Sequence, residues 1–165
     1  MPNWVRNKLF IHGPTDEVKK CTLDIASDNE HISFDKIFPR PSDIGDKWYD
    51  WSVDHWGTKW DVSDTFEDED GYICFDTAWS TPHLIISKLS EMYQELTFEV
   101  QYADESLGYN CGIYFFHQGV ETEYQEYGIE EACRLWGYDL EKLFPELKRD
   151  RVIGDILDVD NSEQL

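Results

Sequence analysis

The 165-residue sequence has few basic residues, no closely spaced cysteines and no long apolar run. No apolar stretch approaches the ~20 residues that a membrane-spanning helix needs. The sequence has no basic segment followed by an apolar one, so it predicts no signal peptide. The cysteines include no Cys-x-x-Cys pair, which argues against a disulfide framework, a zinc site or an iron–sulfur cluster. We therefore expect a cytoplasmic protein that binds no metal or other cofactor.

Familiar catalytic patterns are also missing. The sequence has no His-x-x-x-His motif and no serine in a glycine-flanked nucleophile motif. His55 directly follows Asp54, but neighbouring residues of an extended segment point to opposite sides. Asp54 is thus poorly placed to orient the imidazole for acid–base chemistry. The sequence predicts no catalytic residues and favours a binding protein over an enzyme.

What the sequence does have is negative charge, and the charge is unevenly distributed. The 14 Lys and Arg residues stand against 35 Asp and Glu residues, for a net charge of −21. Residues 61–147 alone contain three basic and 20 acidic residues. An aromatic content of 15% indicates that these charges lie on a folded body. Repulsion disfavours direct contact with nucleic acid or an anionic membrane, whereas a basic protein partner is favoured.

Apolar periodicity and turn residues outline the secondary structure. Alternation of apolar residues predicts strands over 3–12, 72–79, 96–102, 111–117 and 120–127. Helical spacing with end signals predicts helices from Thr15 to about Ser27, from Thr81 to Met92, and from Ile129 to Leu147 with an interruption near Gly137. Between them, the pattern predicts an extended segment over 32–44, a structured loop or short helix over 48–60, and an exposed connection over 61–70.

This order of elements predicts an α+β fold. It suits split βαβ units in a mainly antiparallel sheet with helices on one face, which is the ferredoxin-like arrangement. We expect residues 1–147 to form a single domain with a tryptophan-rich insertion at about 40–70. Residues 148–165 lack a convincing pattern and are expected to be an acidic, mobile tail.

Three parts of the sequence together resemble a known family. They are the opening segment 2–13, the segment 34–41 (FDKIFPRP), and the motif 56–60 (WGTKW) followed by 75–82 (FDTAWSTP). These segments are similar to the YubB-type ferredoxin-like domain family of plasmid, phage and other mobile-element proteins. The resemblance implies a ferredoxin-like topology and a mobile-element setting, and it implies no particular activity.

The first candidate binding site is the motif at residues 56–60. Gly57 permits a tight bend, so that Trp56 and Trp60 could clamp a flat or cationic group beside Lys59. Trp79 would complete an aromatic pocket or hot spot. The alternative is that both indoles of the motif pack against the sheet and Lys59 pairs with a neighbouring carboxylate.

The second candidate site is a set of acidic residues in two stretches of the sequence. The first stretch lacks the ligand spacing of a calcium loop. In the second, Glu121 and Glu123 would point the same way on a strand and imitate the repeating charge of a nucleic-acid backbone. The expected acidic face consists of Asp64, Glu67, Asp68, Glu69, Asp70, Glu121, Glu123, Glu126 and Glu130. The alternative is a charged surface that only confers solubility.

Three functions remain open on this evidence. The leading hypothesis is an acidic protein-binding module of a mobile element or phage. In one form of this hypothesis, the module acts as a nucleic-acid mimic that inhibits a basic host or defence protein. The second is a small-molecule or nucleotide-binding protein, a sponge or an enzyme, that uses the tryptophan pocket. The third is direct nucleic-acid binding, which would use Arg6, Lys8, Lys36 and Arg40. It ranks last because the basic residues are dispersed along the sequence.

Overall fold

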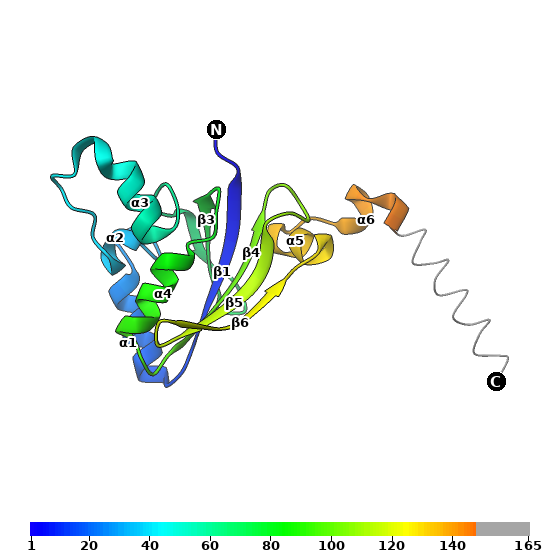
Figure 1. The fold of residues 1–165 in the computed structure, drawn as a ribbon. Coiled ribbons are helices and arrows are strands. Elements are labelled where there is room, and N and C mark those ends of the chain that lie inside the picture. Colours follow the sequence, from blue (N-terminus) through cyan, green and yellow to red (C-terminus); the bar gives the residue numbers. More distant parts are fainter. Residues whose placement is uncertain (148–165) are drawn as a thin grey trace.

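The computed structural model describes residues 1–147 and contains one six-stranded sheet (Figure 1). The strands are β1 (Trp4–His12), β2 (Ser63–Glu67), β3 (Ile73–Ala78), β4 (Thr97–Asp104), β5 (Cys111–His117) and β6 (Val120–Glu126). The helices are α1 (Thr15–Ile25), α2 (Phe34–Ile37), α3 (Trp48–Trp56), α4 (His83–Met92), α5 (Ile129–Trp136) and α6 (Leu140–Leu143), and a 3-10 turn η1 spans Gly45–Lys47. Within this part of the chain, no helix is long and apolar enough to cross a membrane. The tail predicted over 148–165 lies outside the described residues.

The order of the strands explains the fold class. The sheet runs β2-β3-β1-β4-β5-β6, and every neighbouring pair is antiparallel. The chain passes from β1 through α1 to β2, yet β3 lies between those two strands, which is the split βαβ order of ferredoxin-like folds. The hairpin of β5 and β6 extends the sheet beyond β4. The predicted α+β, ferredoxin-like fold is confirmed.

Strand β1 lies at the centre of the sheet and has two different faces. Val5, Leu9 and Ile11 point to one face and are buried, as their alternation predicts. Arg6 and Lys8 point to the other and are only half-buried. We call the side of Val5 the first face and the side of Arg6 the second face.

The main core lies between the first face and helices α1 to α4, which Figure 1 shows gathered on that side of the sheet. Each helix contributes apolar side chains from its inner stripe, including Ile25 of α1, Phe34 of α2, Trp56 of α3 and Leu89 of α4. All four are at most 2% exposed. Burial of these large side chains is the main source of the free energy of folding.

Helix α5 is the exception to the one-sided arrangement, because it packs on the second face. Ala132 and Leu135 of α5 form a small separate core with Ala103 of β4 and Cys111 of β5. Helix α5 ends at Trp136 and is followed by the C-cap Gly137, which has a φ of +71°. Since glycine adopts this left-handed conformation without steric cost, the predicted interruption of the last helical region falls where the sequence places it.

Two connecting segments differ from expectation. The segment 32–44 was expected to be extended, but it contains α2, a single helical turn that ends just before Pro39 and Pro41. The acidic stretch 61–70 was expected to be an exposed connection, but it contains the edge strand β2. An edge strand pairs on one side only, so its acidic side chains remain in solvent while its backbone joins the sheet.

The helix starts also shift by one or two residues. Thr15 is the first residue of α1 rather than its N-cap, and Pro14 occupies the N-cap position. Helix α4 begins at His83, because the hydroxyl of Thr81 hydrogen-bonds the Tyr114 hydroxyl at 2.8 Å instead of capping the helix. At α4, a tertiary contact therefore replaces the local capping interaction of the threonine.

Candidate functional site

The structure brings three residues of the predicted tryptophan site together and separates Trp56 from them. Trp56 is 2% exposed, and its Nε1–H donates to the Phe38 carbonyl at 3.0 Å within the main core. Lys59 lies at the surface, with its Nζ 4.3 Å from the centroid of the Trp60 ring and 4.8 Å from that of Trp79. The ammonium of Lys59 therefore occupies the space between these two indoles. Trp56 takes no part in a pocket, and the other two tryptophans bind the protein's own cation.

Trp79 combines exposure with an unusual backbone conformation. It is 47% exposed and has a φ of +68°, a region that bulky side chains rarely adopt. Its N–H donates to the Asn3 carbonyl at 2.9 Å, and its carbonyl accepts from the Asn110 amide at 3.2 Å. These bonds from two sides hold the strained residue at the end of β3 and present its indole to solvent.

The first acidic stretch lies along β2 and the turn that joins it to β3. Asp68 has a structural role in this turn, since its carboxylate accepts from the Tyr72 and Asp70 backbone amides at 2.9 and 3.0 Å. It also forms an ion pair of 2.8 Å with Lys8 of β1. Asp64, Glu67, Glu69 and Asp70 of the same stretch are accessible to solvent. Asp68 is thus a poor candidate for binding a partner, unlike its neighbours.

The second acidic stretch begins on β6, and all seven residues of this strand are exposed. A bulge changes the expected direction of its side chains. Glu121 is opposite Phe116 and Glu123 is opposite Phe115, so the two glutamates point to opposite faces of the sheet. The expectation that they point the same way is wrong, because one extra residue on β6 reverses the alternation between them.

A contact with α4 agrees with this arrangement. Glu121 lies 2.5 Å from His83 Nε2, on the first face where α4 packs. Glu126 is opposite Gly112, next to Tyr102 on that same face. Glu123 therefore lies on the second face, between two glutamates of the first face. Glu130 follows in the first turn of α5 together with Glu131, whose carboxylate accepts from the Gly128 N–H at 3.0 Å.

The two acidic stretches do not merge into a single face. β2 and β6 are the two outermost strands of the sheet. With a spacing of about 4.8 Å between neighbouring strands, they are roughly 24 Å apart. The basic side chains of Arg6 and Lys8 lie between them on the second face. The chain thus has two acidic edges, and the acidic face predicted from sequence is divided between them.

The second face carries a polar network that the sequence analysis missed. The guanidinium of Arg6 forms two hydrogen bonds with the carboxylate of Asp76, at 2.6 and 3.0 Å. The central carbon of this guanidinium lies 4.5 Å from the centroid of the Trp136 ring of α5. Because Arg6 and Lys8 are both engaged by carboxylates, this face offers little free positive charge to a nucleic-acid backbone.

Glu99 of β4 is a second buried carboxylate of this network. It accepts hydrogen bonds from Gln101 at 2.9 Å and Tyr72 at 3.0 Å, and its other oxygen lies 2.8 Å from His12 Nε2. Burial by itself would raise the pKa of Glu99, but the three bonds together hold that pKa below its ordinary value. Alternation in β1 and β4 predicts which of these residues share a face, but it does not predict their pairing.

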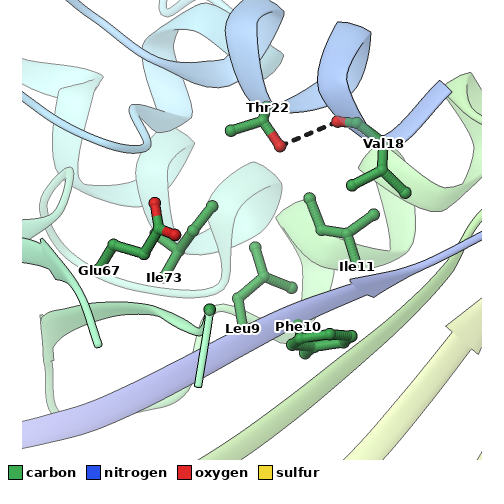
Figure 2. A pocket seen from close by; sticks show the side chains of 8 residues that line it. Leu9, Phe10, Ile11, Val18, Thr22, Glu67 and Ile73 are labelled. Carbon is green, nitrogen blue, oxygen red and sulfur yellow. Dashed lines mark hydrogen bonds between the residues drawn. The ribbon is translucent and has the colours of Figure 1, made fainter. Parts of the chain in front are cut away.

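A hollow of about 170 Å³ lies between β1 and α1 (Figure 2). Figure 2 shows Leu9 and Ile11 directed toward α1, with Val18 of that helix above them. The Thr22 hydroxyl at this site already donates to the Val18 carbonyl at 2.9 Å. Glu67 is the single charged residue of its lining, and because the walls are otherwise mostly apolar, this hollow has the character of a packing gap.

The described residues give no geometry for metal binding or thiol chemistry. Residues 1–147 contain no group of three or more His, Cys, Asp or Glu side chains that could hold a metal ion. All four cysteines are free and buried. His55 stacks on Trp51 and its Nδ1 lies 2.8 Å from the Trp51 carbonyl, so Asp54 is not its partner.

Comparison with known proteins identifies the domain but no activity. A family model described as the ferredoxin-like domain in Api92-like protein matches residues 55–143, more than half of the chain. No curated protein matches the sequence, and no solved structure does. The matched region runs from the end of α3 to α6 and contains five of the six strands. Together with the observed strand order, this match shows that the chain belongs to the family of ferredoxin-like domains in Api92-like proteins.

Proposed function

We propose that this chain is a protein-binding module in which the edge strand β6 pairs with an extended, basic segment of a partner protein. The observation that carries the proposal is that all seven residues Val120–Glu126, three of which are glutamates, are exposed at the edge of the sheet. Natural proteins usually shorten or cover such an edge, because unpaired backbone groups attract other strands. Addition of a strand to a sheet edge is a common mode of peptide recognition.

The backbone of β6 has groups free to pair with another strand. The Tyr127 N–H donates to the Cys111 carbonyl at 3.0 Å, which places that pair of residues among the hydrogen-bonded ones. Hydrogen-bonded and non-hydrogen-bonded pairs alternate in an antiparallel ladder. The register pairs Gln125 with Ile113 and Tyr124 with Tyr114, so the N–H and C=O of Tyr124 and Glu126 point away from β5. These groups are oriented toward an incoming strand.

The charges of β6 match such a segment on both of its sides. Glu121 and Glu126 lie on the first face, and Glu123 lies on the second face. The side chains of an added strand also alternate between the faces. Lysine or arginine at successive positions of the partner would therefore each meet a carboxylate. A flat row of charges on one face, as required to imitate a nucleic-acid strand, is less well supported by this geometry.

The charge of the whole region supports a basic partner. Residues 61–147 carry 20 acidic and three basic residues, so their field attracts positively charged proteins and speeds their association. Nucleic-acid-binding proteins present basic segments of this kind. The resemblance to YubB-type proteins of mobile elements supports a cytoplasmic host or defence protein as the partner, which the module would inhibit by occupying its basic segment.

A defined peptide tests the proposal. An extended peptide with lysine or arginine at successive positions is titrated into the protein at low and high salt, and the dissociation constant is measured by calorimetry. We expect the triple variant E121Q/E123Q/E126Q to bind at least tenfold more weakly than the wild type at low salt. The matched control is E67Q/E69Q/D70N, which removes the same charge at the opposite edge and is expected to change affinity by less than about threefold.

Equal losses in the two triple variants would contradict the proposal, because they would indicate attraction by net charge alone. A second pair of variants tests the backbone. Tyr124→Pro removes an outward N–H without removing a bond to β5, whereas Tyr124→Ala removes the side chain and keeps the N–H. Weaker binding by the proline variant than by the alanine variant is expected if the partner pairs as a strand.

A further inference from the structure

A polar hollow of about 390 Å³ opens beside the end of β6, between that strand and the loop that joins β4 to β5. Four of its eight lining residues are tyrosines. Its lining residues are Tyr102, Gly108, Tyr109, Asn110, Cys111, Tyr124, Glu126 and Tyr127. Two of the residues already assigned to strand pairing, Tyr124 and Glu126, thus also face this hollow.

The register of the sheet accounts for the position of the first tyrosine. Tyr102, Gly112 and Glu126 are opposite one another on β4, β5 and β6. Because Gly112 has no side chain, the ring of Tyr102 lies close over its backbone, within 3.3 Å of the position that a Cβ atom would occupy. The Tyr102 side chain reaches across β5 in this way toward Tyr124 on β6, which after burial is the next cause of the raised pKa of Tyr102. This arrangement fixes one wall of the hollow.

The loop supplies the opposite wall and is itself well held. The Asp104 N–H donates to the Asn110 carbonyl at 3.1 Å, and the Asn110 amide donates to the Asp104 carboxylate at 3.3 Å. Tyr109 projects from this loop and is 71% exposed. An aromatic ring on a fixed loop loses little conformational entropy when it contacts a ligand, which suits it for recognition.

The electrostatic surroundings favour a cation. None of the eight lining residues is basic, and Glu126 is acidic. Burial raises the pKa of the Cys111 thiol, and the carboxylates of Glu131, Glu126 and Asp104 raise it further. Their combined field at the hollow is therefore negative. Arg134, which interacts with the Tyr127 side chain, also donates to Gln101 Oε1 at 3.1 Å and does not line the hollow.

Aromatic faces next to a carboxylate form a typical site for a guanidinium group, which stacks on rings and pairs with carboxylates at the same time. We infer that this hollow receives an arginine side chain from the partner segment that pairs with β6. The arginine belongs to a position on the first face of the added strand, beside Tyr124 and Glu126. The inference rests on the proposed strand pairing for its source of arginine, but the hollow can be tested separately.

The first test uses a small probe that cannot pair as a strand. N-acetyl-arginine amide is titrated into the wild-type protein, and the tyrosine ring and Glu126 signals are followed by NMR. We expect saturable shifts confined to the residues that line the hollow, and about tenfold weaker binding by Tyr109→Ala. Tyr109 is exposed and no side-chain hydrogen bond from it is involved in holding the loop, so this variant retains the fold. The uncharged analogue N-acetyl-citrulline amide is expected not to bind.

The second test uses the basic peptide, with a single arginine at the first-face position replaced by citrulline. We expect about tenfold weaker binding of the citrulline peptide to the wild type and no further loss with Tyr109→Ala. The arginine site would be overturned if the protein bound both peptides with equal affinity and the small probe caused no NMR shifts. That result would leave the proposed function standing. Binding of the small probe without any peptide binding would support the site and overturn the proposed function.

Discussion

The guanidinium of Arg6 on β1 lies against the ring of Trp136 on α5, at 4.5 Å from guanidinium carbon to ring centroid. The Trp136 Nε1–H also donates to the carbonyls of Ala103 and Asp104, at 3.0 and 3.2 Å. Helix α5 is thus attached to both central strands of the sheet. These contacts explain how a helix of only eight residues stays on the second face with a small apolar core.

Substitution of Trp136 is expected to detach α5. Trp136→Ala removes the ring, its hydrogen bonds and its contact with Arg6, and we expect a loss of about 3 kcal/mol in the free energy of unfolding. Trp136→Phe keeps a ring but not the N–H donor, and about 1 kcal/mol is expected for that variant. Urea unfolding measures both values. An alanine variant as stable as the wild type would show that α5 does not depend on this contact.

Two tryptophans of the predicted site are expected to behave differently from each other. Trp56→Ala leaves a cavity in the main core, for which the expected cost is about 3–5 kcal/mol. Trp79→Ala removes a half-exposed ring, and a change of less than about 1 kcal/mol is expected. Thermal and urea unfolding of the two variants provide the comparison. Similar losses of unfolding free energy in the two variants would contradict the finding that Trp56 is buried whereas Trp79 is half-exposed.

The pKa of Glu99 leads to a prediction for acid stability. Burial opposes the shift, but three hydrogen bonds hold this pKa below its ordinary value of 4.5. Burial likewise opposes the shift at Asp68, where hydrogen bonds from Lys8 and from backbone amides hold the pKa below 3.8. The unfolded chain therefore takes up protons before the folded chain does. The stabilisation is complete above about pH 4.5 and is lost as the pH falls through the lower, folded pKa values.

Unfolding free energies measured from pH 7 to pH 3 test this sign. We expect a decline that starts near pH 4.5 and a shallower decline in Glu99→Gln, which cannot lose the charge. The matched control is Glu95→Gln, for which no such network exists in the described structure. A variant at position 99 with the same pH profile as the wild type would contradict the account.

The cysteines are expected to be unreactive in the folded protein. Burial raises the pKa of Cys21 to about 12 and that of Cys74 to about 11. Because the thiolate is the reactive form, a thiol reagent at pH 8 should modify the native protein slowly and all four thiols rapidly in denaturant. Mass spectrometry follows the modification of each thiol over time. Rapid modification of a thiol in the native protein would contradict this expectation and would identify a site that opens locally.

The sequence predicts those features that depend on local periodicity. Alternation in residues 3–12 identifies the buried side of β1. The gap between the strands predicted over 111–117 and 120–127 coincides with the turn at Gln118-Gly119, where both residues have positive φ. The sequence does not distinguish Trp56 from Trp79, because burial depends on which distant elements cover each indole. The bulge in β6 is also missed, since an extra residue leaves no trace in a strand whose residues are all exposed.

The candidate sites show the same division. Composition indicates that residues 61–147 are acidic, but only the strand order shows that β2 and β6 lie at opposite edges. The pairs Arg6–Asp76 and Lys8–Asp68 join residues that are at least 60 positions apart. Pairings over such distances depend on topology, and neither residue spacing nor charge pattern in one sequence specifies them.

The central position of β1 has a consequence for synthesis on the ribosome. β1 is translated before every other strand of the sheet, yet it pairs with β3 and with β4, whose last residue is Asp104. At about 5–20 residues per second, β1 stays without either neighbour for several seconds. Its apolar side, with Val5, Leu9 and Ile11, is exposed to chaperones and to other nascent chains throughout that interval.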